Sequence, residues 1–396
     1  MSAPWLAIIG IGEDGRDGLS PAARILLDGA ETVIGGRRHL ALAGCEERGQ
    51  VWPTPFTAAR PLLQSLRGRP VAVLASGDPS WFGAGATLAR WFEAGEMTIL
   101  PQMSAFSLAA ARLGWPLQDC LCLTIHGRPV EALALHLSPG RRLLILGEDR
   151  TSAAAITALL RDRGYGPSPV TVLERLGGAS ERIVPAGEEQ DDLSVIAVSC
   201  AAEPGLRPLA CVPGLPDEAF LHDGQLTKRD VRAATLAALA PRPGAWLWDV
   251  GAGNGSVAIE WMRAGGRAMA LEPDGDRRDR IARNAAVLGV PDLDIRAGTA
   301  PADLPADSSP DAVFVGGGVA AAGVLESCWN ALAPGGRLVA NAVTAAGEAA
   351  LMAFHRAHGG EMARLSVSHL APLGANGAGP LVWRPALPVT QYRGWR

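Results

Sequence analysis

The stretch that decides the fold is Trp246-Leu-Trp-Asp-Val-Gly-Ala-Gly-Asn-Gly-Ser256. Its apolar first half is typical of a buried strand, and its glycines predict a tight turn that opens a helix. Glycines admit a close ligand and the start of the helix offers free N–H groups, so the stretch predicts a cofactor site. Glu272 lies 17 residues after Gly255, at the end of the next expected strand, where a carboxylate can bind a ribose diol.

Two cofactors share this strand–loop–helix plan. A dinucleotide site uses GxGxxG and places a pyrophosphate at the helix, whereas this loop reads GxGxG and follows the acidic Asp249. A carboxylate beside the loop disfavours a pyrophosphate and suits the ammonium and sulfonium groups of S-adenosylmethionine. The pattern therefore favours S-adenosylmethionine. An NAD-dependent oxidoreductase and a glycine turn without a ligand are the alternatives.

A second glycine-rich signature lies in the amino-terminal half of the chain. It reads Trp5-Leu-Ala-Ile-Ile-Gly-Ile-Gly-Glu-Asp-Gly15 and is joined by Gly77-Asp-Pro79 after an expected strand at Val71–Ala75. Glycine turns after a first strand are common, so the first segment alone is a weak signal. Two cofactor-type signatures in one chain nevertheless suggest two active sites that act in series on one substrate.

The length of the chain and one segment rich in proline and glycine predict two domains. The chain has 396 residues, and domains average roughly 100–200 residues. Proline and glycine crowd the segment Ala202–Pro216, which is poor helix and poor strand. We therefore expect one domain at residues 1–203 and another at residues 212–396. The tail Pro385–Arg396 is expected to be a surface extension.

Short apolar runs alternate with helical patterns in both halves, which predicts an α/β fold for each. The expected strands are Leu6–Ile9, Val71–Ala75, Met97–Leu100, Cys120–Ile125, Arg142–Leu146, Val170–Leu173, Val195–Val198, Ala245–Val250, Arg267–Leu271, Leu293–Arg296, Ala312–Val315 and Arg337–Ala340. The expected helices include one opened by Ser20-Pro21, and Ser104–Leu113, Thr151–Arg163, Thr227–Ala240 and Asp276–Leu288.

Composition excludes several classes of protein. The net charge is −4 and no basic run occurs, so a nucleic-acid partner, including an RNA methyltransferase substrate, is disfavoured. No basic region precedes the first apolar run, and no run of eighteen apolar residues occurs, so we expect neither a signal peptide nor a membrane partner, and a cytoplasmic protein. The six cysteines form no CxxC pair, and His355 and His358 lack a third ligand, so no metal site is expected.

The carboxy-terminal half carries a family resemblance over most of residues 212–385. The runs Gly224–Arg232, Trp248–Glu260, Gly298–Pro301 and Pro310–Gly318 resemble the CbiT-type precorrin methyltransferases. Those are Rossmann-like class I enzymes of cobalamin synthesis, which methylate carbon 15 of the macrocycle and decarboxylate the acetate on carbon 12. The resemblance implies that the following residues contact S-adenosylmethionine: Thr227, Gly251, Ala252, Gly253, Asn254, Gly255, Glu272 and Ala300.

The amino-terminal half resembles the tetrapyrrole methylase family, and most closely its CbiE-type branch, over roughly residues 3–200. The resemblance rests on the runs Gly35–His39, Gly77–Pro79, Pro101–Arg112 and Leu123–Arg128. It implies a two-lobed α/β fold with the methyl donor in the cleft between the lobes. Cofactor contacts are then expected from Gly77, Asp78, Pro79, Ser104 and Ala105. Glu13-Asp14 and Gln102-Met103 depart from the family's usual residues.

Together the resemblances imply a fused enzyme that methylates a precorrin at carbons 5 and 15 and decarboxylates its carbon-12 acetate, converting precorrin-6B to precorrin-8X. Catalytic candidates in the first domain are Asp78 and His126, the latter beside Arg128, while Glu260 in the second is expected to be structural. A homo-oligomer, such as a tetramer through the carboxy-terminal domain, is implied. A non-catalytic tetrapyrrole-binding first domain and a cobalt-precorrin substrate remain as alternatives.

Overall fold

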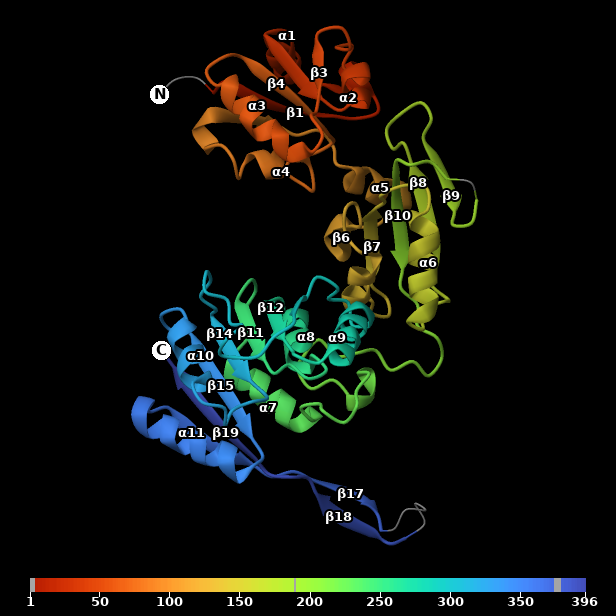
Figure 1. Ribbon diagram of the computed structural model, residues 1–396. Helices are drawn as coiled ribbons and strands as arrows, with labels where there is room; N and C mark the ends of the chain where they lie inside the picture. Colours follow the sequence, from red (N-terminus) through yellow and green to blue (C-terminus); the bar gives the residue numbers. More distant parts are fainter. Residues whose placement is uncertain (1–3, 189, 374–378) are drawn as a thin grey trace. The chain divides into compact units, whose positions relative to one another are not determined.

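The computed structural model describes residues 4–188, 190–373 and 379–396. The chain divides into two compact units. Unit 1 comprises residues 1–130 and 137–206, and unit 2 comprises residues 131–136 and 207–396. The main division falls inside the segment Ala202–Pro216, where proline and glycine interrupt regular structure. Each unit has its own sheets and its own apolar core (Figure 1).

The first lobe of unit 1 is a parallel sheet with helices on both faces. The strand order is β3-β2-β4-β1-β5. Side chains of α1 and α2 pack on one face, and those of α3 and α4 pack on the other. The elements are β1 (Leu6–Ile11), α1 (Pro21–Asp28), β2 (Thr32–Gly35), α2 (Arg37–Leu42), β3 (Gly49–Val51), α3 (Ala59–Ser65), β4 (Val71–Ser76), α4 (Ala84–Leu88) and β5 (Met97–Leu100).

The start of α1 follows the sequence prediction. The Ser20 hydroxyl accepts a hydrogen bond from the Ala23 amide, and Pro21 occupies the first helical position. Strand β1 is longer than expected because Gly10 and Ile11 still pair with β4. The glycine turn therefore begins at Gly12 rather than at Gly10.

The second lobe of unit 1 is a mixed sheet of order β6-β7-β10-β8-β9. Helix α5 packs on one face, where Cys120 and Cys122 also lie. Helix α6 contacts β8. The elements are α5 (Ala105–Leu113), β6 (Cys120–Thr124), β7 (Arg142–Leu146), α6 (Ser152–Asp162), β8 (Val170–Glu174), β9 (Arg182–Pro185) and β10 (Ser194–Ser199).

Unit 2 is a seven-stranded sheet of order β13-β12-β11-β14-β15-β19-β16. The strands from β13 to β15 are parallel, and β19 runs antiparallel to both of its neighbours. Helices α7, α8 and α9 pack on one face, and α10 and α11 on the other. The elements are α7 (Arg229–Leu239), β11 (Trp246–Val250), α8 (Ser256–Arg263), β12 (Arg267–Leu271), α9 (Gly275–Val287), β13 (Asp294–Arg296), β14 (Ala312–Val315), α10 (Val324–Ala331), β15 (Arg337–Ala342), α11 (Ala345–His358), β16 (Glu361–Leu365) and β19 (Val389–Trp395).

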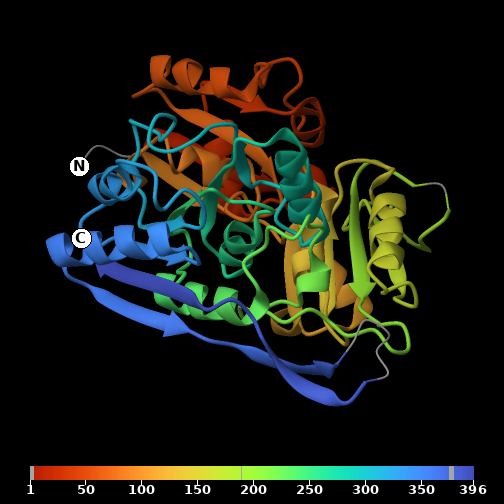
Figure 2. The same cartoon turned by 60° about the horizontal axis from the view of Figure 1, so that its bottom comes forward.

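The carboxy-terminal tail is not a surface extension. Its strand β19 lies between β15 and β16, and Val389 and Tyr392 are buried in it. Figures 1 and 2 show this dark blue strand running along the sheet, and it contacts α11. The prediction was wrong because the tail's polar and arginine residues resemble a solvated segment, whereas burial comes from sheet neighbours that are distant in sequence.

A two-stranded ribbon leaves the sheet of unit 2. It consists of β17 (Ser368–Pro372) and β18 (Leu381–Pro385), which extend away from the sheet in Figure 1. Leu370, Leu381 and Trp383 on this ribbon are exposed. Within the described part of the chain, no helix is both long and apolar enough to span a membrane.

Candidate functional sites

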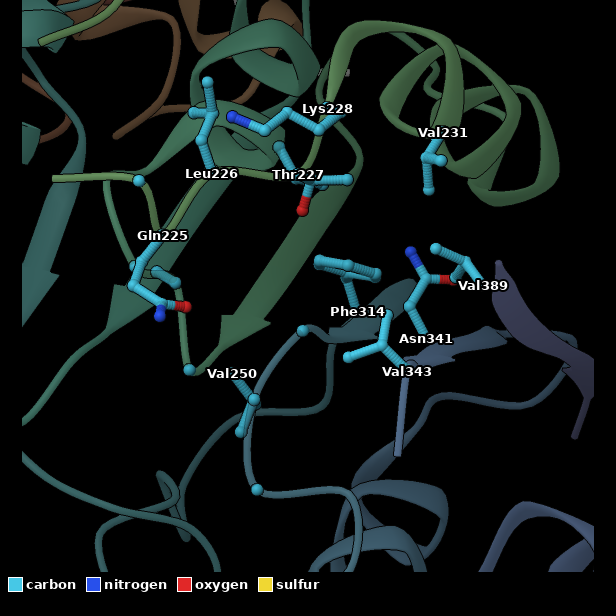
Figure 3. A pocket seen from close by; sticks show the side chains of 18 of the residues that line it. Gln225, Leu226, Thr227, Lys228, Val231, Val250, Phe314, Asn341, Val343 and Val389 are labelled. Carbon is cyan, nitrogen blue, oxygen red and sulfur yellow. The ribbon is translucent and has the colours of Figure 1, made fainter. Parts of the chain in front are cut away.

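Unit 2 contains a cavity of about 1080 Å³ at the carboxyl ends of its parallel strands. This edge is where open α/β sheets generally bind ligands. The cavity wall is formed by the glycine loop after β11, by Glu272 after β12, by the loops 298–300 and 316–318, and by residues 224–231. Figure 3 shows Gln225, Leu226, Thr227 and Lys228 of the last segment. Six of the residues implied by sequence line it: Thr227, Gly251, Ala252, Gly253, Glu272 and Ala300.

Two glycines of the loop are required by its close contacts. Gly251 has a φ of +68°, and a Cβ there would lie 2.9 Å from the backbone of Gly317. Gly253 has a φ of +61°, and a Cβ there would lie 3.0 Å from the Gln225 carbonyl oxygen. Both conformations are unfavourable for residues with a side chain. The bare backbone thus forms the cavity wall between two neighbouring loops.

The Glu272 carboxylate is held in place by the backbone. Its Oε2 accepts a hydrogen bond of 2.8 Å from the Gly253 amide, and its Oε1 accepts one of 3.1 Å from the Asp274 amide. The residue is only 2% exposed, yet it lines the cavity. A carboxylate oxygen can accept more than one hydrogen bond, so Glu272 can also bind hydroxyl groups of a ligand.

Asp249 does not serve the role that its position in the sequence suggested. It is 1% exposed, is not part of the cavity wall, and its Oδ2 accepts a hydrogen bond from the Ala258 amide in the first turn of α8. Burial raises the pKa of this carboxyl group to about 7, and the nearby charge of Glu272 acts in the same direction. Asp249 therefore fixes helix α8 behind the loop and does not face a ligand's ammonium or sulfonium.

Asn254 and Gly255 are also buried behind the loop, outside the cavity wall. The Asn254 Nδ2 donates to Asp223 Oδ1 at 2.9 Å and to the Gln225 carbonyl at 2.6 Å. Arg277 and Arg280 both donate to Asp223 Oδ2. The hydrogen bond from Asn254, followed by that from the Gln225 amide, holds the pKa of Asp223 far below its usual value. Asn254 thus positions the segment 223–225, which carries part of the wall.

Glu260 is structural, as expected. It is buried, and its Oε1 accepts a hydrogen bond of 2.6 Å from Nε of the fully buried Arg232. Glu260 also accepts hydrogen bonds from the amides of Gly214 and Leu215, while Arg232 donates to the Thr227 carbonyl. This pair ties the segment that enters unit 2 to helices α7 and α8, and it fixes the wall at Thr227.

In unit 1, the end of β1, the turn at Gly77 and the segment 102–105 lie against one another. The Gly77 amide donates to the Ile11 carbonyl at 3.0 Å, and the Gln102 amide donates to the Gly77 carbonyl at 3.1 Å. A Cβ on Gly10 would lie 2.0 Å from the Gly77 carbonyl oxygen. A Cβ on Gly77 would lie 3.3 Å from Ser104 Cα and 3.7 Å from the Ala105 amide. The structure thus brings Gly77 together with Ser104 and Ala105.

The other residues implied for unit 1 have mainly structural contacts. Asp78 Oδ1 accepts a hydrogen bond of 2.8 Å from the Ser80 amide. Pro79 is buried, and its carbonyl accepts from Ala86 in α4. The Ser104 hydroxyl caps α5 by accepting from the Ser107 amide at 3.1 Å. These contacts shape the loops and leave their backbone groups and Ala105 as possible ligand contacts.

His126 is exposed on the loop after β6, and its amide donates to Thr124 Oγ1. The neighbouring Arg128 guanidinium lies 5.6 Å from the centre of the Phe82 ring, on the loop that follows Gly77-Asp-Pro79. Phe82 has a φ of +55°, which is rare for a bulky side chain, and strain of this kind gathers at functional loops. The second-lobe loop with His126 therefore faces the loop after β4.

Each half of the chain matches the model of a known protein family. Residues 6–190 match the family of Tetrapyrrole (Corrin/Porphyrin) Methylases, and residues 218–396 match the Precorrin methyltransferase domain. A Sinorhizobium protein named Precorrin-6Y C(5,15)-methyltransferase [decarboxylating] is 46% identical over 98% of this chain and 96% of its own length. A Mycobacterium tuberculosis protein of the same name is 42% identical over 98% of each chain. The chain belongs to the precorrin-6Y C(5,15)-methyltransferase (decarboxylating) family.

One solved structure is similar to part of this chain. It is the C-terminal domain of precorrin-6Y C5,15-methyltransferase from Rhodobacter capsulatus, which is 46% identical and has a TM-score of 0.44. The match covers 48% of this chain and all of that one.

Glu13 and Gln102, which depart from the usual residues of the tetrapyrrole methylase family, both have partners within unit 1. Glu13 forms an ion pair with Arg38, and its other oxygen lies 3.6 Å from Arg175, which follows β8. Arg38 also donates to Ser76 Oγ at 2.9 Å. The Gln102 side chain donates to the Gly18 carbonyl. Glu13 thus connects the loop after β1 with the second lobe.

His39 is a further functional-site candidate that sequence reasoning did not single out. Its Nε2 lies 2.8 Å from Ser76 Oγ, directly before Gly77. Burial, followed by the charge of Arg38, lowers the pKa of His39 to about 4. This imidazole is therefore neutral near pH 7 and can exchange hydrogen bonds with Ser76 without carrying a charge.

Sequence reasoning also did not single out several residues that line the unit 2 cavity. Phe314, Asn341, Val343 and Val389 come from the ends of β14, β15 and β19, and they lie together in Figure 3. Asn341 interrupts an apolar strand, which was the available signal. Lys228 was missed too, although it is the only lysine in the sequence and lines the same cavity.

Proposed function

We propose that this chain transfers two methyl groups to a precorrin macrocycle, at carbons 5 and 15, and decarboxylates the acetate on carbon 12. The methyl donor in this proposal is S-adenosylmethionine at both sites. The observation that carries the proposal is the cavity of unit 2, in which a glycine loop and a fixed carboxylate face a volume of about 1080 Å³. Near-full-length similarity to two decarboxylating C(5,15)-methyltransferases supports the same reading.

The residues of unit 2 fit an adenosine-containing donor. The Glu272 carboxylate can accept hydrogen bonds from the ribose hydroxyls, while Gly251 and Gly253 leave room for close contact along the loop. Thr227 and Ala300 belong to the same cavity wall. S-adenosylmethionine, when bound, supplies an electrophilic methyl group on a sulfonium.

The rest of the cavity suits a large substrate with several carboxylates. Cationic side chains of Lys228, Arg229 and Arg277 belong to its wall, and they can pair with acidic side chains of the macrocycle. Apolar residues on the β15 and β19 side can contact the ring itself. Fixing the two reactants in line supplies on the order of 7–11 kcal/mol of the barrier in well-oriented reactions, so these residues act mainly by orientation.

In unit 1 we place the donor along Gly77, Asp78, Pro79, Ser104 and Ala105. The meeting of Gly77 with the 102–105 segment supports this placement. Asp78 and His126 remain our candidates for moving a proton, and Arg128 is our candidate for binding a substrate carboxylate. The metal-free precorrin is the preferred substrate, because the near-full-length relatives are named without cobalt.

We also propose a homo-oligomer formed through unit 2. The apolar side chains that the β17–β18 ribbon exposes, among them Leu381 and Trp383, support this assembly, because exposed apolar clusters of this kind mark interaction surfaces. Sedimentation velocity on the full chain measures the oligomeric state.

Titration of the full chain with S-adenosylhomocysteine, followed by calorimetry, tests the function. We expect two molecules bound per chain. Glu272→Ala removes the carboxylate that faces the ligand, so this variant should bind one molecule with unchanged affinity at the remaining site. The exposed Glu361→Ala exchange is the matched control and should keep both sites.

A stoichiometry of one in the wild type, lost in Glu272→Ala, would instead assign unit 1 as a tetrapyrrole carrier. Binding that Glu272→Ala leaves intact would contradict the assignment of Glu272.

A further inference from the structure

We propose that Asn341 binds the substrate carboxylate that is lost as carbon dioxide, and that Thr235, Gln391 and Arg393 orient the Asn341 amide for this task. The inference rests on the proposed function of unit 2 and names one residue and one subsite for its decarboxylation. Asn341 belongs to a buried polar network in which the donors and acceptors can be assigned in only one way.

The direction of the network is set by Thr235. Its hydroxyl donates to the Val231 carbonyl at 2.8 Å within helix α7. A hydroxyl carries one hydrogen, so toward its other partners Thr235 Oγ1 can only accept. Those partners are Asn341 Nδ2 at 3.0 Å and Gln391 Nε2 at 3.1 Å. Both amides therefore turn their nitrogen atoms toward Thr235.

Gln391 and Arg393 complete the network. Arg393 Nε donates to Gln391 Oε1 at 2.7 Å, and Gln391 Nε2 donates to Asn341 Oδ1 at 2.9 Å. Thr235 and Gln391 are both 0% exposed. Thr235 and Gln391 have their donors paired within this network, and buried hydrogen bonds of this kind hold their members rigidly. Hydrogen bonds to the buried Thr235 and Gln391 thus fix the orientation of the Asn341 amide.

Asn341 presents one free donor to the cavity. Its Nδ2 has two hydrogens, and among the contacts between described residues only the one to Thr235 is made. Asn341 lines the cavity, whereas Thr235 and Gln391 do not. The pairing of Phe314 with Val339 and of Asn341 with Gln391 puts Phe314, Asn341 and Val389 on the same face of the sheet.

Three of the side chains that line the cavity with this donor are apolar. In Figure 3, Asn341 lies among Phe314, Val343 and Val389, while the Lys228 ammonium lies on the other side of the view, beyond Thr227. A carboxylate held by one neutral donor between apolar side chains is less stabilised than one paired with a cation. Decarboxylation removes that charge from the carboxylate, so weak ground-state stabilisation together with firm orientation favours the reaction.

The step balances without a further reagent. The bond between the carboxyl carbon and the methylene carbon breaks, and its electron pair enters the conjugated imine system of the macrocycle. Carbon dioxide leaves, and the methylene carbon takes up a proton from solvent and becomes a methyl group. Asn341 stays neutral throughout and acts only by holding the carboxylate oxygen.

The test is single-turnover reaction of the full-length Asn341→Leu variant with precorrin substrate and S-adenosylmethionine, analysed by mass spectrometry. Leucine keeps the volume and removes the donor. We expect decarboxylation to slow on the order of 10–100-fold, as for loss of a hydrogen bond to a charged group, so that a methylated product retaining the carboxyl group accumulates. The exposed Asn330→Leu exchange should leave both steps unchanged.

Gln391→Glu tests the positioning role, because a carboxylate at that position accepts where the amide nitrogen donates. We expect it to reproduce the defect of Asn341→Leu in the ratio of decarboxylated to methylated product, with the same affinity for S-adenosylhomocysteine. A smaller substitution, Asn341→Ser, with thermal unfolding of each variant, guards against a folding defect.

Decarboxylation that keeps pace with methylation in Asn341→Leu, or equal slowing of both steps, overturns this inference. Failure of the wild-type chain to bind S-adenosylhomocysteine or to transfer methyl groups would overturn the proposed function instead, so the two failures are distinguishable.

Discussion

At the scale of single residues, two carboxylates near the same loop of unit 2 have different tasks. Glu272 faces the cavity, and Asp249 faces helix α8. Sequence spacing placed both beside the ligand, because the direction of a side chain at a strand end depends on register and on the next element, which spacing does not show. The same limit applies to Asn254, which turns behind the loop, and to Asn341, which turns into the cavity.

Asp249 predicts how the stability of unit 2 depends on pH. Its pKa is raised to about 7 in the folded chain, against about 3.9 in an unfolded chain. The protonated carboxyl group is favoured in the folded chain. Its contribution to stability is fully present below pH ~4 and is lost as the pH rises through 7. Relative to Asp249→Asn, the wild-type free energy of unfolding should therefore fall by about 1.4 kcal/mol per pH unit across this window.

Urea unfolding at several pH values, followed by circular dichroism, measures the difference between the two proteins. Asp292→Asn, which removes an exposed carboxylate of the same unit, is the control. A constant difference between wild type and Asp249→Asn from pH 4 to 7 would contradict the buried-acid interpretation.

At the scale of elements, the Arg232–Glu260 pair connects helices α7 and α8 with the segment that enters unit 2. Arg232→Met removes one partner and leaves the buried Glu260 charge without its cation. The expected loss is about 3–5 kcal/mol in the free energy of unfolding. Arg242→Ala removes a pair with Asp311 in which the arginine side chain is 71% exposed, so this control should cost no more than about 1 kcal/mol.

Denaturant unfolding measures both effects. Equal losses for Arg232→Met and Arg242→Ala would show that the buried pair is not a structural support.

Most elements were predictable from sequence, because apolar periodicity and helix caps are local signals. The parallel strands of unit 2 and helix α9 lie within a residue or two of their expected bounds. Strand β19 was not predictable, since its burial depends on β15 and β16. That omission also concealed part of the cavity wall, because Val389 and the support for Asn341 come from β19.

At the scale of the whole molecule, the two units have separate cores and separate candidate sites, so damage to one should spare the other. In Gly10→Ala the new Cβ would collide with backbone atoms of Gly77 and Gln102. We expect this variant to lose methyl transfer by unit 1 while unit 2 still methylates and decarboxylates. The product then carries one new methyl group, which mass spectrometry detects.

Gly95→Ala is the control in unit 1, because a Cβ there meets nothing within 4 Å. Loss of both methyl transfers in Gly10→Ala would argue that the sites depend on each other. The main division between the units lies in the proline- and glycine-rich segment, where domain boundaries commonly fall, whereas residues 131–136 belong to unit 2 and carry no such signal.

The lone lysine has a practical consequence. Amine-selective reagents can modify only two positions in this chain, the amino terminus and Lys228, which lines the cavity of unit 2. Peptide mass mapping separates the two labels. The rate of Lys228 acylation is therefore a built-in reporter of occupancy, and a carbodiimide could couple this amine to a carboxylate of the bound macrocycle and record which side chain of the substrate lies beside it.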